Sequence, residues 1–136
     1  MKVMIVDDSE IISKRLKELL QDIDGLEIAA LVEDGIQAIS QYSTVNPDIV
    51  ILDLMIPRMN GLDVLRSIRS KGEPVIIIIL TNYDQSYFRD RCAELGANYF
   101  LDKSADFEKV FQICNNIVYP RQINDTDYLL LTKKQS

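Results

Sequence analysis

The sequence predicts a single α/β domain built on a parallel sheet. Five short apolar runs, rich in β-branched residues, alternate with longer stretches in which apolar residues recur at helical spacing. This alternation is typical of parallel strands joined by helices that pack on both faces of the sheet. The 136 residues make one domain of ordinary size. The five predicted strands are Val3–Val6, Leu26–Val32, Ile49–Leu52, Val75–Leu80 and Tyr99–Leu101.

The first half of the chain carries clear boundary signals. Apolar residues from Ile12 to Leu20 share one helix face, and Ser9 stands where it can cap that helix. Gly25 separates this helix from the second strand, which we expect at the side of the sheet. Gly61 opens the third helix.

The second half is organised in the same way. The third and fourth runs are apolar at nearly every position, which indicates strands buried on both faces in the middle of the sheet. Pro74 precedes the fourth run, where a missing N–H does little harm. The clearest helix lies between Phe107 and Val118. We therefore expect a domain over residues 1–119 and a tail over residues 120–136 that is flexible or binds a partner.

Composition excludes several classes of function. Fifteen Lys and Arg against 21 Asp and Glu give a net charge of −6, which disfavours direct contact with nucleic acid or with anionic membranes. The absence of histidine excludes a His-ligated zinc site and a His-based catalytic triad. Cys92 and Cys114 are expected to be reduced helix residues. The longest apolar run is too short for a membrane span, which needs about 20 residues. Since no signal-peptide pattern is present either, we expect a cytoplasmic protein.

Polar side chains follow the predicted strands. The carboxyl ends of parallel strands meet at one edge of the sheet, where α/β proteins bind their ligands. The residues that follow the first, third, fourth and fifth strands are Asp7, Asp8, Asp53, Thr81, Asp102 and Lys103.

The carboxylates of Asp7, Asp8 and Asp53 would repel one another unless a cation lay among them. An oxygen-only donor set suits Mg²⁺, which leaves coordination positions open for phosphate oxygens. Asp53 lies between the others and is a candidate nucleophile, because carboxylates form acyl phosphates. Lys103 would supply a positive charge, and Thr81 a hydroxyl donor, to a phosphoryl group.

The sequence resembles the receiver domain of two-component response regulators, of the single-domain chemotaxis or phosphorelay kind. The resemblance covers residues 1 to about 119. It rests on the segments VMIVDDS at 3–9, DIVILDLMIPRMNGL at 48–62, ILT at 79–81 and GANYFLDK at 96–103. It implies a doubly wound, flavodoxin-like sheet of five parallel strands in the order 2-1-3-4-5, with five helices.

The resemblance also assigns roles at the acidic edge. It implies that Asp53 accepts a phosphoryl group from a histidine kinase or a phosphotransfer protein. Asp8, Asp53 and the main-chain carbonyl of Met55 are the implied Mg²⁺ ligands, and Asp7 completes the acid pocket. Lys103 is the implied ionic partner of the phosphoryl group.

Thr81 is the implied switch hydroxyl and Phe100 the implied switch aromatic. The same site would let water hydrolyse the aspartyl phosphate. The chain is therefore not expected to be a conventional enzyme, although it would catalyse its own phosphotransfer and dephosphorylation. Downstream partners are expected on the surface formed by the fourth helix, fifth strand and fifth helix, where a homodimer is also an option.

Three positions depart from the family pattern. Ser104 follows Lys103 where many receivers have proline with a cis bond. Since a cis bond before a non-proline residue costs about 2.5–4 kcal/mol, we expect a trans or a strained loop, with Ser104 as a candidate cap of the last helix. Phe100 stands where tyrosine is frequent. Asn82 and Tyr83 would shield Asp53, which predicts a long-lived phosphoryl state.

Three alternatives are weighed beside this prediction. A phosphatase of the haloacid-dehalogenase kind needs a second Asp two residues after its nucleophile, and Ser9 breaks that spacing. A receiver-like binding module without phosphorylation would have no reason to retain Asp7, Asp8, Asp53, Thr81 and Lys103. The chain could also be the receiver half of a longer DNA-binding regulator, although it contains no recognition helix itself.

Overall fold

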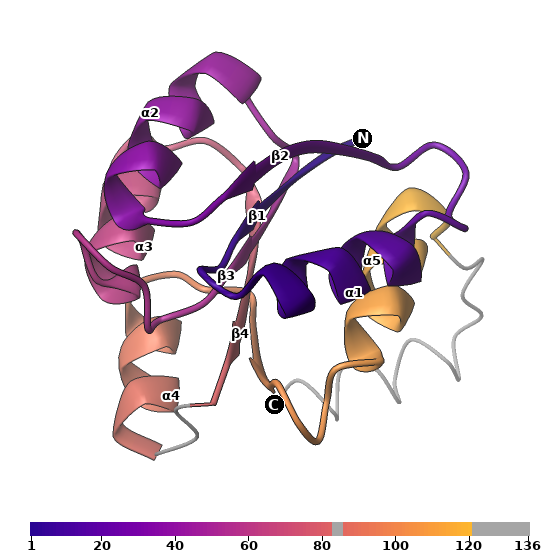
Figure 1. The fold of residues 1–136 in the computed structure, drawn as a ribbon. Helices are drawn as coiled ribbons and strands as arrows, with labels where there is room; N and C mark the ends of the chain where they lie inside the picture. Colours follow the sequence, from indigo (N-terminus) through magenta and orange to yellow (C-terminus); the bar gives the residue numbers. More distant parts are fainter. Residues whose placement is uncertain (83–85, 121–136) are drawn as a thin grey trace, which may run out of the picture.

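The computed structural model describes residues 1–82 and 86–120, in which five strands alternate with five helices (Figure 1). The strands are β1 (Lys2–Val6), β2 (Glu27–Val32), β3 (Ile49–Leu52), β4 (Ile76–Thr81) and β5 (Tyr99–Asp102). The helices are α1 (Glu10–Leu20), α2 (Gly35–Val45), α3 (Gly61–Arg69), α4 (Ser86–Glu94) and α5 (Lys109–Val118). Tyr83 and residues 121–136 of the predicted tail lie outside the described residues.

The strands pair in parallel in the order β2-β1-β3-β4-β5, which confirms the predicted order and the edge position of the second strand. The strand order reverses between β1 and β3, where α/β sheets form their ligand crevice. Val6 pairs with Leu52 at the carboxyl ends of these strands. The backbone N–H of Asp53 donates to the Val6 carbonyl at 3.0 Å, so the residues that directly follow β1 and β3 lie side by side at the edge of the sheet.

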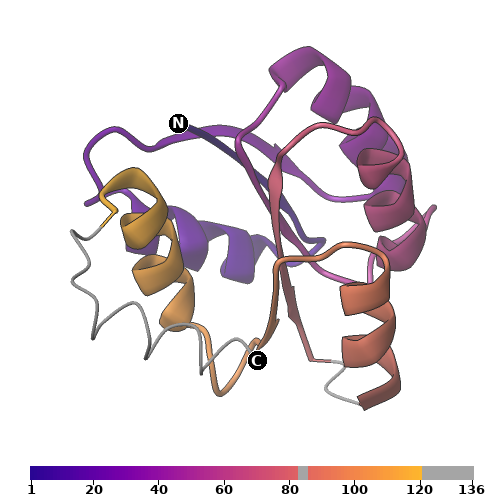
Figure 2. The same cartoon turned by 180° about the vertical axis from the view of Figure 1, so that it is seen from behind.

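Two layers of helices enclose the sheet. Helices α2, α3 and α4 cover one face, and α1 and α5 cover the other, as the views from the two sides show (Figures 1 and 2). Met4 and Val50 point into the first layer, while Val3 and Ile49 point into the second, and all four are fully buried. This two-sided burial confirms what the continuous apolar runs predicted for the central strands.

Side-chain caps fix where three helices begin. The Ser9 Oγ accepts a hydrogen bond from the Ile12 N–H at 3.3 Å, which confirms the predicted cap of α1. Asp34 and Asn60 cap α2 and α3 in the same way. The interpretation of Ser104 as the cap of the last helix was wrong, because α5 begins only at Lys109.

The remaining differences from the sequence prediction are small. The predicted fourth strand is shifted by one residue, because the ladder starts with the Ile76 N–H donating to the Asp48 carbonyl. The described residues contain no cis peptide bond, so the bond between Lys103 and Ser104 is trans. Cys92 and Cys114 are free, buried thiols on helices. Among the described residues, no helix is long and apolar enough to span a membrane.

Candidate functional site

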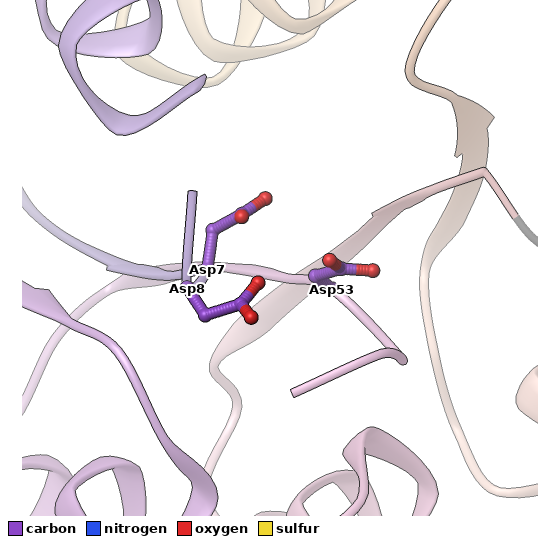
Figure 3. A group of neighbouring side chains, drawn as sticks. All are labelled: Asp7, Asp8 and Asp53. Atoms are coloured by element: carbon purple, nitrogen blue, oxygen red, sulfur yellow. The ribbon is translucent and has the colours of Figure 1, made fainter. Parts of the chain in front are cut away.

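Three carboxylates meet at the carboxyl ends of β1 and β3. Asp7 and Asp8 directly follow β1, and Asp53 directly follows β3 (Figure 3). One oxygen of each lies within 4.8 Å of the others. Asp7 and Asp53 are only 3% and 4% exposed, whereas Asp8 is exposed to solvent. The parallel register of β1 and β3 therefore produces the acidic cluster that the sequence predicted.

Lys103 bridges the two buried carboxylates. Its Nζ lies 2.8 Å from Asp53 Oδ2 and 2.7 Å from Asp7 Oδ2. The Lys103 side chain is itself 10% exposed, so solvent screens these contacts weakly. A residue at the end of β5 thus reaches across the end of β4 to the centre of the site.

Burial and neighbouring charges shift the pKa values of Asp7 and Lys103. Burial raises the pKa of Asp7 and outweighs the lowering effect of the Lys103 ammonium and of the Ser9 N–H. Burial alone would lower the pKa of Lys103, but its hydrogen bonds to Asp53 and Asp7 prevail and raise that pKa. The cluster holds three carboxylates and Lys103 pairs with two of them, which leaves excess negative charge, and an all-oxygen donor set of this kind suits Mg²⁺.

Backbone N–H groups hold the two buried carboxylates in place. The Ser9 N–H donates to Asp7 Oδ1 at 2.8 Å, and the Met55 N–H donates to Asp53 Oδ1 at 3.1 Å. Each carboxylate therefore uses one oxygen on the backbone and the other on Lys103. Met55 itself is 54% exposed.

The two predicted switch residues lie on neighbouring strands. Thr81 ends β4, is fully buried and pairs in register with Asp102. Phe100 is half-buried on β5, and the guanidinium carbon of Arg89 lies 4.7 Å from the centre of its ring. Arg89 also donates to the Phe100 carbonyl at 3.3 Å, so the sequence analysis missed a direct contact from α4 to this aromatic.

A second feature absent from the sequence analysis is a clamp on the loop between β3 and α3. Arg58 in this loop has a left-handed φ of 71° and pairs with buried Asp34 at 3.4 Å. The Gly35 N–H donates to the Pro57 carbonyl at 3.1 Å. A Cβ at Gly35 would collide with the backbone carbonyl of Met59 and would lie 2.5 Å from the Met59 Cβ. The start of α2 thus holds the loop that directly follows Asp53.

We expect Gly35→Ala to displace this loop, to weaken Mg²⁺ binding and to lower the free energy of unfolding by about 1–3 kcal/mol, the usual cost of overpacking. Calorimetric Mg²⁺ titration and chemical denaturation measure the two effects. Gly72→Ala is the matched control: it adds left-handed strain at φ 72° but meets no atom within 4 Å. Unchanged Mg²⁺ affinity in Gly35→Ala would show that the clamp does not act on the site.

Known proteins resemble the chain in both sequence and structure. A family model described as the response regulator receiver domain matches residues 3–115. The transcriptional regulatory protein YdfI of Bacillus subtilis is 36% identical over 110 residues, which cover 81% of this chain and 51% of YdfI. A two-component response regulator of the LuxR family from Aurantimonas is 27% identical, with a TM-score of 0.79 over 98% of this chain and 96% of that chain. CheY in a CheX–CheY–BeF3–Mg²⁺ complex from Borrelia burgdorferi is 29% identical, with a TM-score of 0.78 over 89% of this chain and 90% of that one.

The chain spans about half or less of the length of the curated relatives that it matches. The similarity therefore concerns the domain that these relatives share with it, not their remaining parts.

The fold, the site and the comparisons agree. Receiver domains bind Mg²⁺ at an acidic pocket, and the cluster of Asp7, Asp8 and Asp53 is such a pocket. The sheet order is the one expected of this family. Because the family model covers most of the described residues, this chain belongs to the receiver domain family of two-component response regulators.

Proposed function

We propose that Asp53 is the phosphoacceptor and that a histidine kinase or a phosphotransfer protein supplies the phosphoryl group. The single observation that carries this assignment is the environment of Asp53. Its carboxylate is buried between the Lys103 ammonium and the Met55 N–H, at the switch point of the sheet. Asp7, Asp8, Asp53 and the Met55 main-chain carbonyl are the proposed Mg²⁺ ligands.

The proposed reaction is an in-line phosphoryl transfer. An Asp53 oxygen attacks phosphorus while the bond from phosphorus to the donor breaks, and the electron pair of that bond leaves with the donor. Lys103 neutralises charge on the transferred oxygens. Mg²⁺, when bound, supplies additional neutralisation of the same charge. Attack by water on the phosphorus of the acyl phosphate would break its bond to the Asp53 oxygen, release inorganic phosphate and return Asp53 to its carboxylate, so the domain would control the lifetime of its own signal.

The output would be a change in partner binding. In this proposal the Thr81 hydroxyl donates to the phosphoryl group, and Phe100 responds by changing its packing beside Arg89. Tyr87 on α4 is 66% exposed and Tyr99 on β5 is 42% exposed, which supports the face of α4, β5 and α5 as the surface for a protein target or a second copy. A cytoplasmic location and the absence of direct contact with nucleic acid remain predictions.

Acetyl phosphate, a small phosphodonor, tests the proposal without a cognate kinase. Purified protein incubated with acetyl phosphate and Mg²⁺ should gain one phosphoryl group in its intact mass, and peptide mapping should place it on Asp53. Chelation of Mg²⁺ should prevent the gain. Absence of the adduct, with Mg²⁺ binding demonstrated separately and with a histidine-phosphorylated donor also inactive, would favour a binding module that is not phosphorylated.

The lifetime of the adduct is a further expected result. Asn82 directly follows Thr81, the last residue of β4, and is exposed; in this proposal it shields the acyl phosphate. We expect decay over minutes or longer after acetyl phosphate is removed, followed by intact mass. Loss of the adduct within seconds in Mg²⁺ buffer would contradict this expectation.

We expect the Mg²⁺ affinity to fall as the pH is lowered. The fall should occur at a higher pH than the range in which an ordinary aspartate titrates. The pKa of Asp7 is raised from 3.8 by burial, and protonation of Asp7 removes a negative charge from the pocket. The sign follows because Mg²⁺ competes with protons for the carboxylates. Calorimetric titrations at a series of pH values measure the effect. In Asp7→Asn the remaining pH dependence should move to lower pH, and identical profiles would exclude Asp7 as the cause.

A second candidate is the receiver part of a longer DNA-binding regulator. It is favoured because the match covers only 51% of YdfI, whose name describes a transcriptional regulator. An antibody against this domain would measure the native size of the protein in cells. A native chain about as long as YdfI would support this candidate, and a chain of the present size would favour a single-domain switch.

A further inference from the structure

Two aspartates close the loop between β5 and α5 into a tight turn. Asp102 Oδ1 accepts hydrogen bonds from the N–H groups of Ser104 and Ala105, both at 2.8 Å. One carboxylate oxygen thus binds the two residues that immediately follow Lys103. A proline at position 104 would lack the first of these donors.

Asp106 closes the same turn from its other end. Its Oδ2 accepts a hydrogen bond from the Asp102 N–H at 3.0 Å, and its own N–H donates to the Asp102 carbonyl at 2.9 Å. The ammonium of Lys109 lies 3.0 Å from Asp106 Oδ1. These contacts lower the pKa of Asp106, chiefly through the hydrogen bond from the Asp102 backbone.

Lys103 is the residue that this turn encloses. Its backbone N–H donates to the Thr81 carbonyl at 3.0 Å, which continues the β4–β5 ladder by one bond. The next regular element, α5, starts only six residues after Lys103 and has no side-chain cap. Between β5 and α5 the backbone is therefore held by the hydrogen bonds to Asp102 and Asp106. The turn therefore fixes the root of a long side chain whose ammonium must reach Asp53 and Asp7.

We propose that Asp102, supported by Asp106, is a positioning residue that sets where the Lys103 ammonium lies relative to Asp53. Neither aspartate is among the groups that contact the Lys103 ammonium. The effect passes through the backbone at Ser104 and Ala105. A lysine side chain has many rotamers, so a small shift at its root spreads the ammonium over a larger volume. The inference rests on the proposed role of Asp53 as phosphoacceptor.

The first test is a double-mutant cycle on phosphorylation by acetyl phosphate, in the full chain with Mg²⁺. We expect Asp102→Ala to lower the phosphorylation rate about tenfold, since misplacement of a charged group by a fraction of an ångström has effects of this order. Asp102→Asn keeps an oxygen acceptor for both N–H groups and should restore most of the rate. In a Lys103→Met background, Asp102→Ala should change nothing, because no ammonium remains to be positioned.

Asp63→Ala is the matched control. Asp63 is an exposed aspartate on α3 whose side chain pairs with Arg66. It should leave the rate unchanged in both backgrounds. An equal loss from Asp102→Ala with and without Lys103 would overturn the proposal, because the turn would then act on overall stability or on Asp53 directly. An unchanged rate in Asp102→Ala would also overturn it. If Asp102→Ala does not fold, Asp106→Ala takes its place in the cycle.

The second test does not depend on phosphorylation. Unfolding free energies of wild type, Lys103→Met, Asp53→Asn and the double variant give the coupling between Lys103 and Asp53. The same cycle in the Asp102→Ala background should give a smaller coupling, and an unchanged coupling would overturn the proposal. If only the phosphoacceptor assignment is wrong, Asp102→Ala should still reduce the coupling between Lys103 and Asp53, but neither the wild type nor any variant should gain an adduct on Asp53.

Discussion

Asp53→Asn is expected to abolish the Mg²⁺-dependent phosphoryl adduct. The amide removes the nucleophilic oxygen charge while keeping the shape of the side chain and an acceptor for the Met55 N–H. We expect the phosphorylation rate to fall by at least about 10³-fold, as is usual when a covalent nucleophile is lost. Intact mass after incubation with acetyl phosphate measures the adduct, and circular dichroism checks that the variant is folded.

Asp48→Asn is the control at the opposite end of the same strand. Asp48 immediately precedes β3, and its Oδ2 accepts the Lys2 N–H at 2.8 Å, a bond that asparagine can keep. This variant should be phosphorylated like the wild type. An adduct that persists in Asp53→Asn and maps to Asp7 or Asp8 would place the acceptor directly after β1 instead.

The fold could be predicted because its determinants are local and repeated. Strands buried on both faces must be apolar throughout, and β3 and β4 are; helices covering one face must repeat their apolar residues, and α1 and α5 do. The ends of the strands are harder to predict than the strands themselves, because burial and hydrogen bonding end at different residues. Val75 is buried and was counted in the fourth strand, but its carbonyl accepts the Arg69 guanidinium at 2.6 Å and the ladder begins at Ile76.

The acidic edge could also be predicted, for a geometric reason. The carboxyl ends of parallel strands converge, so the residue type that follows each strand determines what meets there. Strand ends alone, without side-chain directions, are enough to place four residues at one edge: Asp7, Asp8, Asp53 and Lys103. The structure brings these residues together. Their chemical roles remain predictions.

What supports this edge could not be predicted from spacing. The clamp by Gly35 depends on the left-handed backbone at Arg58 and on how closely α2 approaches the β3–α3 loop. The Asp102–Asp106 turn depends on side chains that fold back on their own backbone, which any loop aspartate can do. Ser104 does not cap the last helix, since its N–H donates to Asp102 Oδ1 and α5 begins only at Lys109. Such contacts follow from three-dimensional proximity rather than from periodicity.

The second large effect is expected at Lys103. Lys103→Met keeps the length of the aliphatic side chain and removes the ammonium that bridges Asp7 and Asp53. We expect the phosphorylation rate to fall by about 10²–10³-fold, the loss that follows removal of one group that stabilises the charge of a transition state. Intact-mass time courses with acetyl phosphate measure the rate. Lys71→Met is the control, because Lys71 is an exposed lysine after α3 whose Nζ contacts Ser43, away from the acidic cluster.

The Mg²⁺ affinity separates this electrostatic role from a loss of fold. The ammonium and the metal ion compete for the same carboxylates, so its removal should leave Mg²⁺ binding unchanged or tighter while phosphorylation slows. It should also raise the pKa of Asp7 further, because the lowering effect of Lys103 on that carboxyl disappears. A collapsed site would lose both metal binding and phosphorylation. Opposite or independent changes in the two measurements are therefore the result that assigns Lys103 to the phosphoryl group, and a parallel loss of both would show that it serves only to hold the buried carboxylates together.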